Sequence, residues 1–217
     1  MIQADHIAQW KDETKMSRRL LIFIWIVLCA SLPISGVSGA SGDDIEDMMP
    51  AFDSIMRVMM DGEAQYDPLN PDFFWETIHL MAVNFTSIDS DEEVGYDEDT
   101  CELLLPALAV REMAIALFAD YDGILPIPSS ASYLARYDDD LNRYHFPLSD
   151  AGDSYARIDR YAFSPENFVF VVYASLVSYD EEETFLSVKF ELMPNTALGD
   201  IVIRYYPYSV VSAEAVK

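Results

Sequence analysis

The chain has 217 residues, of which 51% are hydrophobic and 24% charged, so it is long and apolar enough to fold around a packed core. Acidic residues outnumber basic ones 38 to 13, and the net charge of −25 excludes nucleic acid as the expected partner, because phosphate binding needs clustered Lys and Arg. Two cysteines are too few for a disulfide scaffold, and the sequence has no phosphate-binding glycine loop, HExxH or GxSxG motif, so no cofactor is expected.

Residues 1–40 have the three zones of an export signal. A polar segment with four basic residues precedes the uncharged stretch 20–34, and small residues then follow up to Ala40. The strongly apolar part is shorter than the ~20 residues that a membrane-spanning helix needs. We expect a signal peptide that starts at Met1 or Met16 and is cleaved near Ala40, which leaves residues 41–217 as a single domain outside the cytoplasm. The alternative is a membrane anchor formed by residues 20–34.

Three helices are expected after this segment. Apolar residues recur at i, i+3, i+4 and i+7 spacing from residue 45 onward and predict an amphipathic helix over about 47–62. We interpret its methionines as core residues, the alternative being a promiscuous binding surface. Asn70 followed by proline and aspartate is a helix start, and this second helix continues to about residue 85. A third helix is expected over about 106–121.

The most acidic stretch, 87–102, lies between the second and third helices. Asp89, Asp91 and Glu93 imitate the opening of a calcium-binding loop, but the glycine and the final glutamate of such a loop are missing. We therefore expect a solvated acidic loop without a metal site, with weak calcium binding as the alternative. The acidic cluster 138–140 is interpreted in the same way.

From residue 144 onward the hydrophobic period is two, which is typical of strands. Strands are expected over 155–163, 167–178, 186–192 and 201–211, joined by short polar turns. The predicted fold class is α+β, with the N-terminal helices packed on one face of a C-terminal four-stranded antiparallel meander.

This order of elements resembles the NTF2-like (cone-shaped α+β) fold, and also uncharacterised exported bacterial proteins. The resemblance is carried by the aromatic helix at Phe73-Phe74-Trp75, the segment 117–126, the hairpin 168–193 and the closing strand 201–211. Cystatin-like folds are the nearest alternative, and three helices before the sheet disfavour them.

The resemblance implies a concave sheet around an apolar pocket. Some NTF2-like domains are enzymes with an Asp or His in this pocket, and many are binding or assembly modules. The candidate acid–base residues for such a pocket are His79, His145 and Asp159. The candidate ligand-binding residues are Tyr144, Tyr161 and Tyr173.

No catalytic constellation is recognisable from the spacing of these residues. We therefore expect an exported, non-enzymatic protein that binds a small apolar ligand or a protein partner through the sheet face, the partner including a second copy in a homodimer. The alternative is a pocket enzyme of the isomerase or hydratase kind, with a carboxylate or histidine as general base.

Overall fold

The computed structural model describes residues 42–62, 65–86, 94–150, 152–180, 182–195 and 206–216, all within the compact unit Ser41–Lys217. The expected signal peptide over 1–40, the alternative anchor over 20–34 and the calcium candidates Asp89, Asp91 and Glu93 lie outside the described residues. Within the described ranges, no helix is long and apolar enough to cross a membrane.

The helices are α2 (Gly42–Glu46), α3 (Met49–Gly62), α4 (Pro71–Phe85) and α5 (Ala107–Leu117), with a short 3₁₀ turn at Ser129–Ala131. The α3 helix begins just before Pro50, which is tolerated there because the first-turn N–H groups have no helical acceptor. At the start of α4, the Asn70 side chain accepts a hydrogen bond of 3.0 Å from the backbone N–H of Asp72. The predicted helices over 47–62, 71–85 and 106–121 are therefore present, the last one ending earlier than expected.

The described strands form two antiparallel sheets of four strands each. The small sheet has the order β1-β2-β4-β3 and consists of β1 (Gly95–Asp97), β2 (Glu102–Pro106), β3 (Arg136–Asp138) and β4 (Arg143–Pro147). The large sheet has the order β5-β6-β7-β8 and consists of β5 (Ser154–Ser164), β6 (Val169–Ser178), β7 (Thr184–Pro194) and β8 (Tyr208–Ala215).

The α+β class is confirmed, and the expectation of a single sheet is wrong. The large sheet is the predicted meander, except that its last strand is Tyr208–Ala215 and not 201–211, of which residues 201–205 lie outside the described residues. The small sheet was not predicted. Its strands have three to five residues, which is too short for a period of two to become visible. The stretch 87–102 is also not one continuous loop, since β1 and the first residue of β2 lie in it.

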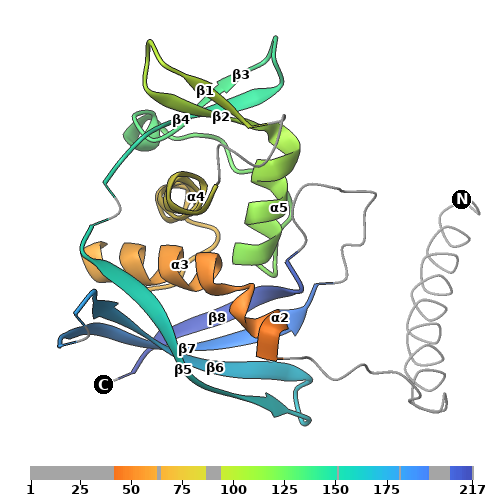
Figure 1. The fold of residues 1–217 in the computed structure, drawn as a ribbon. Coiled ribbons are helices and arrows are strands. Elements are labelled where there is room, and N and C mark those ends of the chain that lie inside the picture. Colours follow the sequence, from red (N-terminus) through yellow and green to blue (C-terminus); the bar gives the residue numbers. More distant parts are fainter. Residues whose placement is uncertain are drawn as a thin grey trace, which may run out of the picture. The chain divides into compact units, whose positions relative to one another are not determined.

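The α3, α4 and α5 helices lie between the two sheets (Figure 1). The α3 helix contacts β5, β6 and β7 of the large sheet, and α4 contacts α3 on one side and β2 and β4 of the small sheet on the other. Phe52 of α3 packs on Phe190 of β7 with ring centroids 4.6 Å apart, and Trp75 of α4 packs on Tyr144 of β4 at 5.4 Å. The core is therefore made by helix faces that cover the inner face of each sheet.

The α5 helix runs from one sheet to the other (Figure 1) and contacts β2, β4 and β8. At its start, the N–H of Ala107 donates to the carbonyl of Asn142 in the turn between β3 and β4, at 3.1 Å. Just past its end, the N–H of Ala119 donates to the carbonyl of Val210 in β8, at 2.9 Å. The chain leaves the helix at Phe118, earlier than predicted, because the next residue bonds to a strand.

A buried ion pair joins α3 to β5. Asp53 and Arg57 lie one turn apart on α3, both buried, and the Arg57 guanidinium donates to the Asp53 carboxylate. The carboxylate also accepts the backbone N–H of Ala156 at 2.8 Å, and the guanidinium donates to the carbonyl of Ser154. Because β5 is an edge strand, these two side chains supply the partners that a neighbouring strand would otherwise give.

Candidate functional site

The two candidate histidines lie on opposite faces of the small sheet. His79 of α4 is beneath the sheet, with Nε2 2.8 Å from the carbonyl oxygen of Pro147, to which it donates as a neutral imidazole. Burial lowers the pKa of His79, and the hydrogen bond to Pro147 opposes this effect only in part. Tyr144 and Phe146 of β4 also face α4, so His145, which stands between them in the strand, points to the outer face.

His145 belongs to a polar cluster on this outer face. Its Nδ1 lies 3.0 Å from Oε2 of Glu102, which also accepts hydrogen bonds from Arg136 at 2.8 Å and Thr100 at 3.1 Å. Burial alone would raise the pKa of the Glu102 carboxyl, but these hydrogen bonds outweigh burial and hold its pKa below the usual range. His145 is only 5% exposed, and its Nε2, 3.9 Å from Oδ2 of Asp138, has no hydrogen-bond partner among the described residues.

A carboxylate next to an imidazole is the chemistry of an acid–base pair. Here, however, the Arg136 guanidinium lies 2.8 Å from Nδ1 of His145 and also donates to the Glu102 carboxylate, so both members of the pair already interact with Arg136. Within the described ranges, no group of three or more His, Cys, Asp or Glu residues is placed to hold a metal ion. The arrangement acts as a bridge between β2, β3 and β4.

Asp159 lies in the other sheet. It is the extra residue of a bulge in β5, where the register shifts between Ile158 and Arg160. Its carboxylate accepts hydrogen bonds from Arg157 at 3.3 Å and from the Ser175 hydroxyl at 2.6 Å, on the face of the large sheet away from α3. The structure therefore does not bring His79, His145 and Asp159 together, since each lies on a different face.

The three candidate tyrosines are also separated. Tyr144 packs under the small sheet, where burial raises its pKa to about 12. Tyr173 lies on the outer face of the large sheet, with the Arg160 guanidinium 4.2 Å from its ring centroid. Tyr161 pairs with the buried Val172, which places it on the opposite face from Tyr173, and it is largely exposed.

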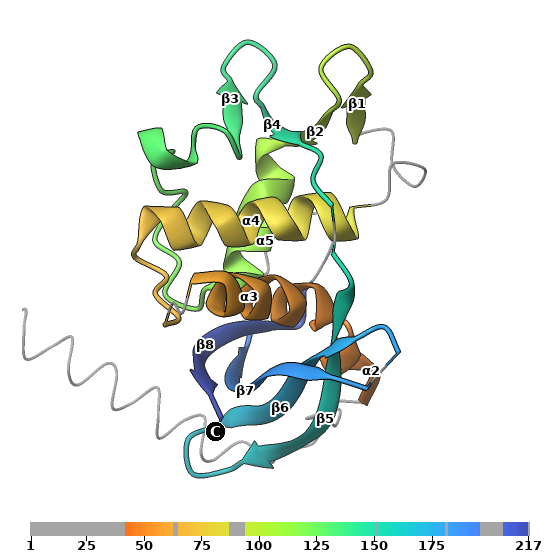
Figure 2. The ribbon, with the colours of Figure 1, turned by 90° about the vertical axis from the view of Figure 1, so that its left-hand side faces the viewer.

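The hollow with the largest volume among those described was not predicted from the sequence. It encloses about 870 Å³ and is lined by residues from the end of α3 and from β8. Figure 2 shows α3 lying over the large sheet. We call this hollow the β8 groove; its lining residues are Met59, Met60, Gln65, Tyr66, Phe185, Leu186 and Ser212, Ala213, Glu214 and Ala215. Met60 is 37% exposed and Phe185 43% exposed, so its walls present apolar surface to solvent.

A smaller hollow of about 310 Å³ shares Met60 and Phe185 with the β8 groove and is also lined by Asp150 and by residues 152–154. We call it the side hollow. Asp150 and Asp153 line it, together with Arg57, whose guanidinium is held by Asp53. Apart from this paired guanidinium, the charged groups in its lining are carboxylates.

Tyr66 closes one end of the β8 groove. Its hydroxyl lies 2.8 Å from the carbonyl oxygen of Leu117 and 2.9 Å from that of Val210. The single O–H group therefore donates to both carbonyls and links the end of α5 to β8. Burial raises the pKa of Tyr66, and the charge of Asp120 adds to this effect. The phenol therefore acts as a structural donor at the wall of the groove.

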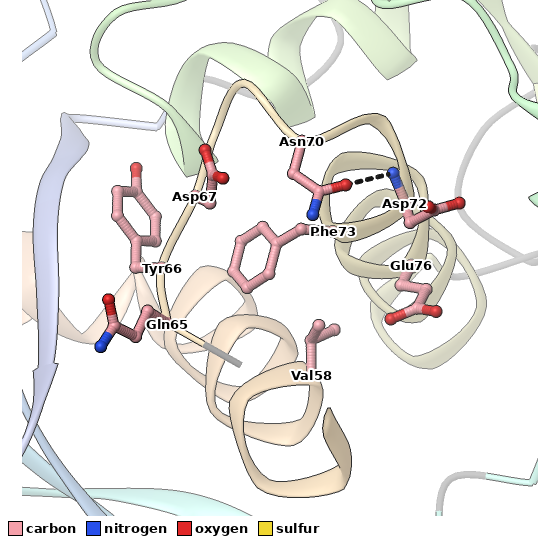
Figure 3. Close-up of a pocket in the computed structure, with 8 residues that line it drawn as sticks. All are labelled: Val58, Gln65, Tyr66, Asp67, Asn70, Asp72, Phe73 and Glu76. Carbon is pink, nitrogen blue, oxygen red and sulfur yellow. Dashed lines mark hydrogen bonds between the residues drawn. The ribbon is translucent and has the colours of Figure 1, made fainter. Parts of the chain in front are cut away.

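A third hollow, of about 400 Å³, lies between the end of α3 and the first turns of α4 (Figure 3). It shares Gln65 and Tyr66 with the β8 groove. Its polar lining includes the carboxylates of Asp67, Asp72 and Glu76. All three hollows around the end of α3 are thus bordered by acidic side chains.

No protein-family model, curated protein or solved structure matches this chain. Function is therefore inferred from the geometry of the chain itself.

One feature of the sequence points to the β8 groove in retrospect. Phe185 is apolar but stands one residue out of phase with Leu186 and the apolar positions after it, on what would be the wet face of the strand. Met60 gives no such signal, because its spacing places it with the expected core methionines of α3; the structure buries Met59 but leaves Met60 37% exposed, so that expectation is wrong for Met60. An apolar residue at a polar position is the signal for an exposed apolar surface.

Proposed function

We propose that this chain is an exported, non-enzymatic binding protein that holds a segment of a partner protein in the β8 groove. The observation that carries the proposal is the groove itself, in which the exposed side chains of Met60 and Phe185 stand beside the edge of β8. Methionine and aromatic side chains are enriched in the buried centres of protein interfaces, because they bury a large area and adapt to a partner.

The shape of the site favours a polypeptide over a small apolar ligand. Small-molecule sites enclose most of the ligand surface, whereas the walls of this groove present Met60 and Phe185 to solvent, and Glu214 is part of its lining. An extended chain can lie along such an open groove and meet polar groups at its rim.

The separation of the candidate acid–base residues disfavours the pocket enzyme. None of the three hollows described above is lined by His79, His145 or Asp159. General acid–base catalysis needs such a group within hydrogen-bond reach of the bound substrate. Export, signal cleavage near Ala40 and the NTF2-like resemblance stay predictions, and binding in the groove does not depend on them.

The test uses the full chain and an array of immobilised peptides of varied sequence. We expect the chain to bind a subset of the peptides, and Met60→Ser and Phe185→Ser each to weaken binding by about 1–2 kcal/mol, or about 5- to 30-fold, through the loss of buried apolar area. Phe168→Ser is the matched control, because Phe168 is 74% exposed and lies at the other end of β6 from the turn that leads to Phe185.

Unfolding in urea checks that all three variants keep their fold. Failure of the full chain to bind any peptide, or an equal loss in the Phe168 control, would remove the proposed function. Binding that depends on Met60 and Phe185 but not on Phe168 supports it.

A further inference from the structure

We propose that the β8 groove takes an extended, cationic polypeptide segment, which adds as a fifth strand to the free edge of β8. This inference rests on the proposed function and names the class of partner and the way it binds. In strand addition, main-chain hydrogen bonds give the affinity and the pockets beside the edge accept alternate side chains.

The register between β7 and β8 identifies the edge groups that point away from the sheet. Near the end of β8, the N–H of Val216 donates to the carbonyl of Ser187 at 2.8 Å. In an antiparallel ladder, hydrogen-bonded pairs alternate with pairs whose N–H and C=O groups point outward. With Val188 opposite Ala215 and Phe190 opposite Ala213, it is Ala213 and Ala215 that direct their main-chain groups to the open edge.

The two halves of this edge differ. In the first half, the outward carbonyl of Val210 accepts hydrogen bonds from the N–H of Ala119 and from the Tyr66 hydroxyl, so α5 and Tyr66 close the edge there. A bulge between Ser212 and Val210 resets the alternation. In the second half, within the described part of the chain, no loop, helix or side chain donates to or accepts from the outward groups of Ala213 and Ala215.

Both residues line the β8 groove. Ala213 is only 7% exposed, so its outward groups lie near the floor of the groove, whereas Ala215 is exposed and its outward groups are open to solvent. Buried main-chain groups without a partner are rare in folded proteins because each costs free energy. An added strand supplies partners for two donors and two acceptors on β8, and it covers Met60 and Phe185 at the same time.

The charge of the chain selects a cationic segment. Among the described residues that line the three hollows around the end of α3, the carboxylates are Glu214, Asp150, Asp153, Asp67, Asp72 and Glu76. The guanidinium of Arg57 is the one cationic group in these linings, and Asp53 neutralises it. Glu214 lines the β8 groove, and Asp67, Asp72 and Glu76 line the hollow that shares Gln65 and Tyr66 with it, whereas Asp150 and Asp153 lie toward β5, at the opposite edge of the sheet, and add only to the overall field. A segment with Lys or Arg at alternate positions is attracted by these charges while its other residues face the apolar wall of the groove.

The same charge argues against a second copy on this edge. Three of the acidic and four of the basic residues lie within 1–40, which leaves 35 acidic and 9 basic residues in 41–217. Two such units repel each other, and pairing of β8 with its own copy would bring the same acidic rims together. A positively charged strand is attracted by the field that disfavours the dimer.

The test measures binding of the full chain to a labelled peptide of about nine residues that alternates Val and Lys, a length that spans the free edge with a margin on each side. Two analogues carry N-methyl groups on all Val or on all Lys residues, so each keeps the charge and side chains but loses the N–H groups along one edge of the strand. We expect micromolar or tighter binding of the parent peptide and at least about a tenfold loss for one or both analogues. The Glu–Val counterpart of the peptide is expected not to bind.

On the protein side, Ala215→Pro removes one outward N–H and leaves the pairing of β8 with β7 intact, because proline is tolerated at such an edge position. We expect it to weaken binding of the Val–Lys peptide at least about tenfold, whereas the control Ala215→Ser, which keeps the N–H, binds as the parent chain does. Urea unfolding of both variants confirms that they fold equally well.

The outcomes separate this inference from the proposed function. One outcome is that both methylated analogues and the Ala215→Pro variant bind as tightly as the unmodified peptide and chain, while Phe185→Ser weakens binding. The groove then binds peptides without strand addition, which refutes this inference and leaves the proposed function standing. Equal binding of the Glu–Val peptide overturns the cationic preference. A dimer that forms in sedimentation experiments and is dissolved by Ala215→Pro assigns the edge to a second copy and also overturns it.

Discussion

Replacing Asp53 by asparagine is expected to destabilise the chain by about 3–5 kcal/mol, since it leaves the buried guanidinium of Arg57 without its anion. The asparagine oxygen can still accept the N–H of Ala156, so the loss is mainly electrostatic. Arg57→Met should cost a similar amount, because it leaves the Asp53 carboxylate buried with one neutral donor. For a domain of this size, the midpoint of unfolding in urea falls by roughly 1–2 M.

The double variant Asp53→Leu with Arg57→Met tests the reasoning further. Both charges are gone, and the remaining loss is that the N–H of Ala156 and the carbonyl of Ser154 lack their side-chain partners, each worth about 1–3 kcal/mol. The double variant is therefore expected to be more stable than the sum of the two single losses predicts, with a coupling of several kcal/mol. Glu46→Gln, an exposed change on α2, serves as the control. Single variants that shift the midpoint by less than about 0.3 M would refute the role of the pair in docking α3 on β5.

Three further predictions concern single side chains. Because burial lowers the pKa of His79, the unfolded chain binds more protons than the native chain just below pH 6.5. The urea midpoint of unfolding should therefore fall as the pH is lowered through this window. The fall should be smaller in the His79→Gln variant. Because the pKa of Glu102 is lowered, its carboxylate contributes stability above the ordinary pKa of 4.5, and this stability is lost as the pH falls further. The Glu102→Gln variant should therefore be less stable than the parent by about 1 kcal/mol at pH 7. In chemical denaturation series this difference should shrink toward pH 3. Tyr66→Phe should cost about 1–3 kcal/mol, because the carbonyls of Leu117 and Val210 lose a shared donor, and an unchanged urea midpoint would contradict that bond.

The long segments with a clear hydrophobic period were the part of the fold that could be predicted from the sequence. The helix start at Asn70 and the strands over 155–163 and 167–178 all have enough residues for their period and their caps to be recognised. The small sheet could not be found in this way. Its strands are short, and their stability comes from α4 packing under Tyr144 and from the Glu102 cluster, which are contacts between distant parts of the chain.

The candidate site was predictable only as residue types. His79, His145 and Asp159 are the side chains that acid–base chemistry uses, but their positions depend on which face of which sheet each one occupies, and one of those sheets was not predicted. The β8 groove depends on the edge of a strand and the end of a helix that lie far apart in the sequence. Only Phe185, an apolar residue out of phase with its strand, marks it locally.

The bonds at the two ends of α5 have a consequence for how the molecule comes apart. Four strands of three to five residues do not form a stable sheet on their own. The small sheet is tied through Asn142 to the start of α5, and the other end of α5 is tied to Val210 in the large sheet. Fraying of β8 therefore releases α5 and, with it, the support of the small sheet, so the two sheets melt as one cooperative unit although they share no strand.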